Sequence, residues 1–235
     1  MAVNAPIVWS ASNGSISTTG VFTPYASGQH TVSACFGLVC AVETVTVTPG
    51  APTTLVATGS ASEITADQTM TITAQVVDQF GNVVPNEVIT YTPSNGSMDF
   101  AQPNLFNPYA VGLQTIAVGW NGQTVDVDVL VTTGVATYFT LEGCSGTNPA
   151  GVWCSITHTL YDQFDNEIVD VSQAGSLTWT VENGNYSTLN EEYFPDHVGV
   201  WMLNLTSTSG AEGQLAIVVG HGEMDRLPVW TAGRS

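Results

Sequence analysis

Residues 8–17 read VWSASNGSIS, and the pattern returns as TYTPSNGSMD from Thr90 and as TWTVENGNYS from Thr178. Each copy places an aromatic residue ahead of an Asn-Gly pair, which is typical of a tight reversal because Asn and Gly tolerate positive φ. We expect the aromatic residue to fill a core between two sheets, and a ligand-stacking role is the alternative. A turn that recurs in this way indicates an internally repeated β structure.

The register of the repeat holds downstream of the turn. In every copy a Phe or Tyr stands two residues before a Pro, and a Gly follows four residues after that Pro. These positions are Phe22, Pro24 and Gly28, then Phe106, Pro108 and Gly112, and finally Tyr193, Pro195 and Gly199. The pattern predicts a corner at each Pro and a new strand from each Gly.

The second and third copies share an earlier signature, VVDQFGNVVPN from Val76 and LYDQFDNEIVD from Leu160. Apolar and polar residues alternate before the first of these, with Met70, Ile72 and Ala74 on one face. Period-2 alternation interrupted by Asn-Gly, Gly and Pro predicts short strands and an all-β sandwich.

The WSxSNGSI, GxFTP and DQFGNxVP patterns resemble those of bacterial Ig-like (Big) domains, found in invasin- and intimin-type adhesins and other prokaryotic surface proteins. The resemblance covers nearly the whole chain. It implies tandem immunoglobulin-like β-sandwiches that act as spacers or adhesion platforms. Because the matching residues occupy turns and core positions, they carry the fold and do not by themselves assign a function.

The repeat spacing predicts three domains: a partial Ig-like domain at 1–49 and complete ones at 50–133 and 134–235. Only residues 1–8 precede Trp9, whereas whole strands precede Tyr91 and Trp179 in the later copies. Two explanations are open for the incomplete first domain. A boundary cuts through it, or another chain supplies the strands by swapping or donor-strand pairing, which would make the protein self-associate.

The composition bounds the partners and the compartment. The 235 residues include 20 acidic and 2 basic side chains, for a net charge of −18, with no Lys. Such a chain repels phosphate backbones, so no nucleic acid is expected as a partner. No apolar stretch reaches the ~18 residues of a membrane span, so we expect no membrane insertion in this segment.

Charged residues make up only 9% of the chain, which favours a secreted or cell-surface protein. Because Met1 leads directly into sequence without a signal peptide, we expect a piece of a longer exported protein.

The four cysteines form two pairs that are local in sequence, Cys35 with Cys40 and Cys144 with Cys154. Neither pair has the C-x2-C spacing of a zinc site. Two disulfides formed in an oxidising compartment explain this pattern, and free buried thiols are the alternative.

No catalytic motif is present. The four His residues are scattered at His30, His158, His197 and His221, and neither H-E-x-x-H nor G-x-S-x-G occurs. His158 aligns with Ala74 on the inward face, so a core histidine is predicted there. We therefore expect no enzyme.

Calcium is the one cofactor that the residues suggest. Asp162, Asp165 and Asn166 stand close together in YDQFDNE and could supply the oxygen ligands that a hard cation requires. The alternative is a turn in which the acid accepts bonds from the backbone, which explains Asp162 equally well.

The remaining candidate sites are surface positions. Trp120 in the GWNG turn and Trp153 between two cysteines are candidate binding residues if exposed, and Asn185 and Asn204 lie in N-x-S/T glycosylation sequons.

These features favour a non-enzymatic structural or adhesive stalk of a surface protein whose ligand is a glycan or a protein. The alternatives are an accessory carbohydrate-binding module of a secreted enzyme, or a subunit of a surface filament or layer completed by strand donation.

Overall fold

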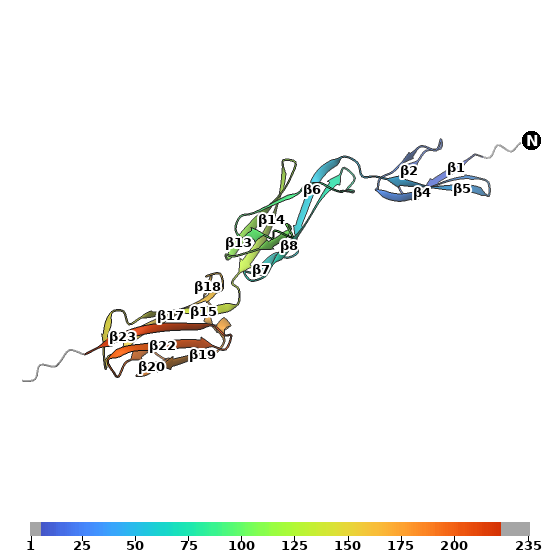
Figure 1. The fold of residues 1–235 in the computed structure, drawn as a ribbon. Coiled ribbons are helices and arrows are strands. Elements are labelled where there is room, and N and C mark those ends of the chain that lie inside the picture. Colours follow the sequence, from blue (N-terminus) through green and yellow to red (C-terminus); the bar gives the residue numbers. More distant parts are fainter. Residues whose placement is uncertain (1–5, 222–235) are drawn as a thin grey trace, which may run out of the picture. The chain divides into compact units, whose positions relative to one another are not determined.

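The computed structural model describes residues 6–221, and strands form nearly all of its regular structure (Figure 1). We number the repeats 1, 2 and 3 by the predicted boundaries, which remain a prediction. By contacts the chain forms two compact units. Unit 1 comprises Met1–Ser62, Met70–Asn107 and Leu113–Val129, and unit 2 comprises Glu63–Thr69, Pro108–Gly112 and Leu130–Ser235.

Repeat 1 contributes five strands to unit 1. β1, β4 and β5 form an antiparallel sheet in that order, and β2 pairs with β3. The bounds are β1 (Val8–Ala11), β2 (Ser15–Ile16), β3 (Phe22–Thr23), β4 (Gly28–Phe36) and β5 (Val39–Val47). The predicted Cys35–Cys40 disulfide is present and joins β4 to β5, where the two residues are directly opposed.

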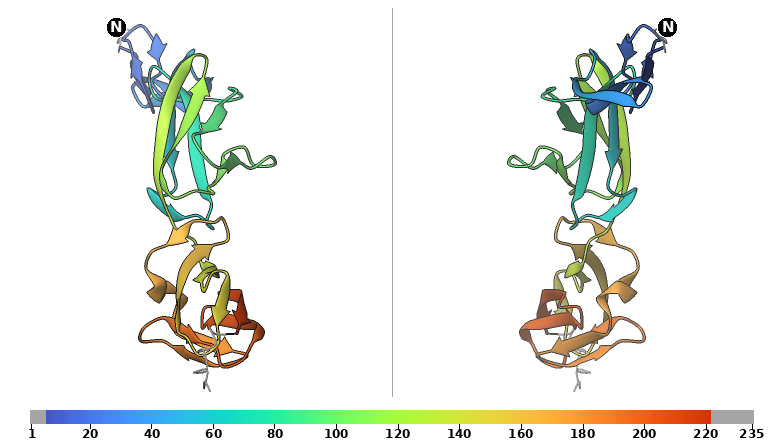
Figure 2. Two further views of the ribbon diagram at one scale, coloured as in Figure 1. Left: turned by 90° about the vertical axis from the view of Figure 1, so that its left-hand side faces the viewer. Right: turned by 90° about the vertical axis from the view of Figure 1, so that its right-hand side faces the viewer.

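Repeat 2 adds the strands that repeat 1 lacks. One sheet has the order β10-β13-β14-β7 and the other β11-β12-β8-β6, with β9 paired to β8. Figure 2 shows β13 and β14 as long adjacent arrows. The bounds are β6 (Pro52–Gly59), β7 (Glu63–Thr65), β8 (Met70–Asp78), β9 (Val83–Val84), β10 (Thr90–Pro93), β11 (Ser97–Met98), β12 (Leu105–Asn107), β13 (Gly112–Trp120) and β14 (Gln123–Thr132).

Repeat 3 repeats this set of strands within unit 2. The order is β19-β22-β23-β15-β17-β21-β20, with β16 paired to β23 and β18 to β17. The bounds are β15 (Ala136–Gly143), β16 (Thr147–Pro149), β17 (Cys154–Asp162), β18 (Glu167–Ile168), η1 (Val171–Ala174), β19 (Leu177–Val181), β20 (Asn185–Ser187), β21 (Glu192–Phe194), β22 (Gly199–Ser207) and β23 (Glu212–Gly220). The predicted Cys144–Cys154 disulfide is present and joins the residue that follows β15 to the first residue of β17.

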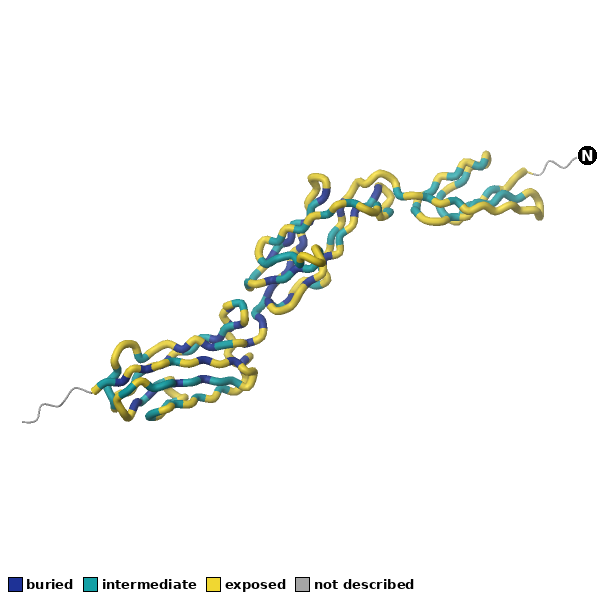
Figure 3. Tube along the Cα trace, viewed as in Figure 1, coloured by how far each residue is buried: buried dark blue, intermediate teal, exposed yellow. Residues whose placement is uncertain are grey.

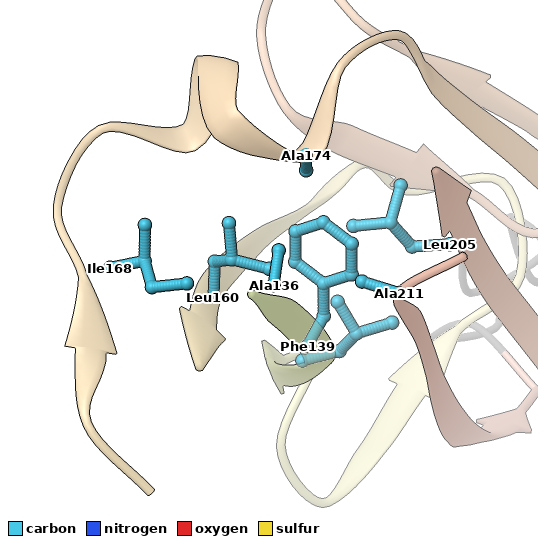
Figure 4. Packing of buried hydrophobic residues seen from close by; sticks show 8 residues of the cluster. Ala136, Phe139, Leu160, Ile168, Ala174, Leu205 and Ala211 are labelled. Carbon is cyan, nitrogen blue, oxygen red and sulfur yellow. The ribbon is translucent and has the colours of Figure 1, made fainter. Parts of the chain in front are cut away.

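The predicted alternation places apolar side chains inside repeats 2 and 3. Met70, Ile72 and Val76 of β8 are buried, as are Ile116 and Val118 of β13. In repeat 3 the ring of Phe139 lies among Leu160, Leu205 and Ala211 (Figure 4). Each such side chain stabilises the fold by about 1.5–3 kcal/mol relative to an exposed one.

Repeat 1 has no such core. Within residues 6–49 every position is partly or fully exposed, while buried positions run through the other two repeats (Figure 3). Trp9, Val32 and Ala34 line a shallow apolar depression on the β1-β4-β5 sheet. In repeat 2 the counterparts of Val32 and Ala34 are Ile116 and Val118, which are fully buried because there β6 and β8 belong to a second sheet. Residues 6–49 therefore form strands without a buried core, and the predicted domain boundaries stay a prediction.

Candidate functional site

Metal-binding side chains are not clustered in the described part of the chain. No group of three or more His, Cys, Asp or Glu residues within 6–221 could hold a metal ion. His30 bonds to the carbonyl of Ala26 at 2.7 Å, and His197 to the side chain of Asn183 at 2.9 Å. His158 lies against the rings of Phe139 and Trp179, in the core position predicted for it.

The DQFGN segment forms a closed turn around Asp78, which we call the Asp–Asn turn of repeat 2. Oδ1 of Asp78 accepts the backbone N–H groups of Phe80 and Asn82, both at 2.9 Å. Oδ2 accepts the Asn82 side-chain amide at 2.9 Å and the N–H of Gly50 at 2.8 Å. The carboxylate is 3% exposed, so every one of these donors replaces water that burial removed.

The DQFDN segment builds the same turn around Asp162 in repeat 3. Its carboxylate accepts the N–H groups of Phe164 at 2.9 Å, Asn166 at 3.0 Å and Gly134 at 2.9 Å, and the Asn166 side-chain amide at 2.9 Å. Asp162 is fully buried. The fourth residue of each turn has positive φ, which Gly81 adopts freely and Asp165 adopts at 64°.

These bonds act on the protonation of the two acids. Burial disfavours the charged carboxylate of Asp78, but the bonds from Asn82, Gly50 and Phe80 outweigh it and lower the pKa to about 2. Burial likewise opposes ionisation of Asp162, and the bonds from Asn166, Gly134 and Phe164 lower its pKa as well. Both turns are therefore built around a carboxylate that is ionised at neutral pH.

The recurring Asn-Gly turn supports the Pro corner, by which we mean residues 24–28, 108–112 and 195–199. Oδ1 of Asn13 accepts the N–H of Ala26 at 3.1 Å, and Oδ1 of Asn183 accepts the N–H of His197 at 3.0 Å. Gly14 has φ 87°, and a Cβ there would collide with the carbonyl oxygen of Thr23. Asn-Gly recurs because Asn bonds the corner and Gly permits its close approach.

In unit 1 the Asp–Asn turn of repeat 2 is bonded to the Pro corner of repeat 1. The Asn82 side-chain amide donates to the Tyr25 carbonyl at 3.2 Å, and its Oδ1 accepts the Ser27 N–H at 2.8 Å. The rings of Tyr25 and Phe80 lie 6.3 Å apart. We call this set of contacts a junction.

Unit 2 contains the same junction at the corresponding residues. The Asn166 side-chain amide donates to the Tyr109 carbonyl at 2.9 Å, and its Oδ1 accepts the Val111 N–H at 3.2 Å. The ring of Phe164 lies 5.8 Å from that of Tyr109. The bonded residues are 57 and 55 apart in sequence in both junctions.

Sequence reasoning missed the partners of these turns. The sequence predicts calcium binding or an isolated turn for Asp162 and Asn166, and it assigns no role to the corner residues Tyr25 and Tyr109. One signal was available in PYASG from Pro24 and PYAVG from Pro108, since each of these precedes a repeat that carries D-Q-F-x-N.

The calcium prediction for Asp162, Asp165 and Asn166 stays untested. The oxygens of Asp162 already accept N–H donors, and Oδ1 of Asp165 accepts the hydroxyl of Tyr138 at 2.6 Å. That bond and burial raise the pKa of Tyr138 to about 12. The donor set therefore fits amide groups better than a cation.

The two candidate binding tryptophans differ. The expected exposure of Trp120 is wrong, because it is 8% exposed and its indole N–H donates to Glu87 at 2.7 Å. Trp153 is exposed as expected, at 47%, and its ring lies 5.0 Å from that of Phe194 with a 50° tilt. Glycosylation stays a prediction, at an exposed Asn185 in β20 and a half-buried Asn204 in β22.

Comparison with known proteins yields structural likeness only. No family model and no curated protein matches the chain. The described part contains no helix with the length and apolar character needed to cross a bilayer.

Among solved structures the chain is similar to the Escherichia coli adhesin FdeC, at 15% identity over 83% of this chain and 74% of that one, with a TM-score of 0.48. It is also similar to the bacterial integrin-binding protein invasin, at 14% identity, 92% and 52% coverage and a TM-score of 0.42. A third is surface layer protein SbsC, domains 4–9, at 17% identity, 93% and 39% coverage and a TM-score of 0.31. These neighbours include bacterial Ig-like adhesins, and the chain spans about half of the invasin structure or less than half of the SbsC one.

Proposed function

We propose that this chain is a non-enzymatic structural segment of a secreted or cell-surface protein, in which Ig-like repeats are joined in series by Asp–Asn turns. The observation that carries the proposal is the junction, which is present with the same bonds and the same ring contact in unit 1 and in unit 2. A turn that only closed its own loop would not need Asn82 and Asn166 to bond a preceding corner.

Other features favour an exported protein. Two disulfides close local loops, which suits an oxidising compartment. The net charge of −18 without Lys suits a salty medium, in which screening reduces self-repulsion. A glycan or a protein is the kind of surface ligand that the parent molecule would bind.

Hydrogen exchange of the corner amides tests the junctions. We expect Asn82→Ala to speed exchange of the Ser27 amide about tenfold and to leave Val111 unchanged, with the converse for Asn166→Ala. Asn190→Ala, on an exposed loop, is the matched control and should change neither. If the Ser27 and Val111 amides exchange equally fast in all variants, the junctions do not hold and the proposal fails.

A second experiment tests the structural role itself. The chain is displayed on bacteria between a surface anchor and a tip epitope, and antibody access to the tip is compared with that of an Asn82→Ala/Asn166→Ala chain. A stalk predicts reduced access in the double variant at equal expression, and equal access contradicts it.

A glycan-binding module is the second candidate, because Trp153 is exposed beside Phe194. A glycan array separates the two functions: specific binding that Trp153→Ala abolishes would favour the module.

A filament subunit is the third candidate, since the depression of Trp9, Val32 and Ala34 is open. A sedimentation coefficient that rises with protein concentration, and that no longer does so in Trp9→Ser, would favour strand donation.

A further inference from the structure

The chain contains a third Pro corner, residues 195–199, that is built like the two occupied ones. Asn183 Oδ1 accepts the N–H groups of Asp196 and His197, both at 3.0 Å, as Asn13 does for Ala26. Gly184 has φ 83°, close to the 87° of Gly14, and a Cβ on it would meet the carbonyl oxygen of Phe194. The same supports therefore shape this corner.

The strand that follows the corner is also equivalent. Gly199 opens β22 opposite Val219, as Gly28 opens β4 opposite Val47. By sequence Gly222 stands three residues after Val219, as Gly50 stands three residues after Val47. Gly222 itself lies outside the described residues.

The two polar groups that a turn would bond are presented at this corner. The carbonyl of Asp196 corresponds to those of Tyr25 and Tyr109, and the N–H of Val198 to those of Ser27 and Val111. Within residues 6–221 neither group has a hydrogen-bond partner, and Val198 is 44% exposed. In unit 1 and unit 2 the corresponding groups are bonded by Asn82 and Asn166.

We propose that the 195–199 corner is a docking surface for the Asp-x-x-x-Asn turn of a further Ig-like repeat joined after Gly222. This inference rests on the proposed function, because it extends the junction to a third position. The occupant is defined by the two occupied corners. It is a turn whose Asn bonds the carbonyl of Asp196 and the N–H of Val198, and whose own buried Asp carboxylate accepts the amide of that Asn, as Asp78 and Asp162 do.

Two features make this corner different from the others. The N–H of Gly151 donates to the Pro195 carbonyl at 2.8 Å. Asp196 replaces the Tyr whose ring contacts Phe80 or Phe164 in the two junctions. A turn with Phe at that position gains no ring contact here and meets a carboxylate instead. The third corner should therefore bind its turn through the backbone bonds alone, and Asp196→Tyr should strengthen docking.

The test uses a chain in which a copy of residues 135–221 directly follows Gly222. Gly222 then precedes the copy as Gly134 precedes residue 135. Exchange of the Val198 amide is measured by nuclear magnetic resonance in this protein and in the unextended chain. We expect the appended copy to slow it about tenfold. Changing the Asn166 of the appended copy to Ala should restore fast exchange, and Asp196→Tyr should slow exchange further only when the copy is present.

Two internal readouts keep the result interpretable. Protected amides in the strands of the appended copy show that it folds, and the Val111 amide reports the occupied junction in the same molecule. Val198 exchange that is unaffected by a folded appended copy, while Val111 stays protected, would overturn the docking surface and leave the proposed function intact. Loss of protection at both positions would instead overturn the junction itself.

Discussion

The side-chain amide of Asn166 donates a hydrogen bond to the backbone carbonyl of Tyr109 at 2.9 Å, although the two residues are 57 positions apart in sequence. Asn82 and Tyr25 form the same bond at 3.2 Å across the same separation. Since each Asn also bonds the buried acid four residues before it, the amide connects a buried carboxylate to a distant corner.

Replacing Asn166 by Ala should destabilise the protein by about 1–3 kcal/mol. The change leaves the Asp162 carboxylate without its side-chain donor and removes the bonds that Asn166 makes to Tyr109 and Val111. Urea unfolding, with Asn190→Ala as the control, measures the effect. A loss below ~0.5 kcal/mol, the usual range for an unremarkable surface change, would argue against the bonds described.

Stability should fall in acid between about pH 4 and pH 2. The pKa of Asp78 is lowered in the folded protein from 3.8 to about 2, so its stabilising effect is complete above 3.8 and disappears as pH falls through about 2. Asp162, whose pKa is also lowered, acts in the same direction. The free energy of unfolding measured against pH should show this slope, and it should be shallower in Asp78→Asn.

Gly184→Ala should be more destabilising than Gly151→Ala, by about 1 kcal/mol or more. Both glycines have nearly the same positive φ, 83° and 80°, so the cost of backbone strain is matched. Only at Gly184 would the new Cβ meet the carbonyl oxygen of Phe194, whereas nothing lies within 4 Å at Gly151. Equal losses of stability in thermal unfolding would show that the backbone at the corner can move away from a Cβ at residue 184.

Removing the Cys144–Cys154 disulfide with a double Ser substitution should cost about 2–3 kcal/mol. The bond closes a loop with a sequence separation of 10 between β15 and β17. Denaturant unfolding with and without reductant checks this prediction in two proteins that both lack Cys35 and Cys40. Reductant should lower the stability of the protein that keeps Cys144 and Cys154 to that of the protein in which they are also replaced by Ser. An undiminished free energy after verified reduction would contradict the prediction.

Chelation should leave the melting temperature of the full chain unchanged. The oxygens of Asp162 are occupied by N–H donors and Asp165 accepts the Tyr138 hydroxyl, so calcium would have to displace bonds already made. Thermal scans with calcium and with a chelator provide the comparison. A rise of several degrees with calcium that Asp165→Asn removes would establish the ion site instead.

Much of the fold was predictable because the information is local. The alternation of Met70 and Ile72, the positive φ of Gly14, and the pairing of cysteines five and ten residues apart depend on neighbouring residues. The predicted exposure of Trp120 is wrong for the complementary reason. Its turn is polar, but Glu87 accepts its indole N–H and the strand end packs inward, which only the assembled sheet decides.

The sequence by itself determined the repeated β-sandwich pattern and the two disulfides, since turn chemistry and strand period act over a few residues. Only the tertiary structure decided what the Asp–Asn turns do. Asp162 and Asn166 were visible as a polar pair in the sequence, but their partners Gly134 and Tyr109 lie 28 and 57 residues away. Folding brings these groups together and removes their water, and a buried carboxylate and amide then bond the backbone groups within reach.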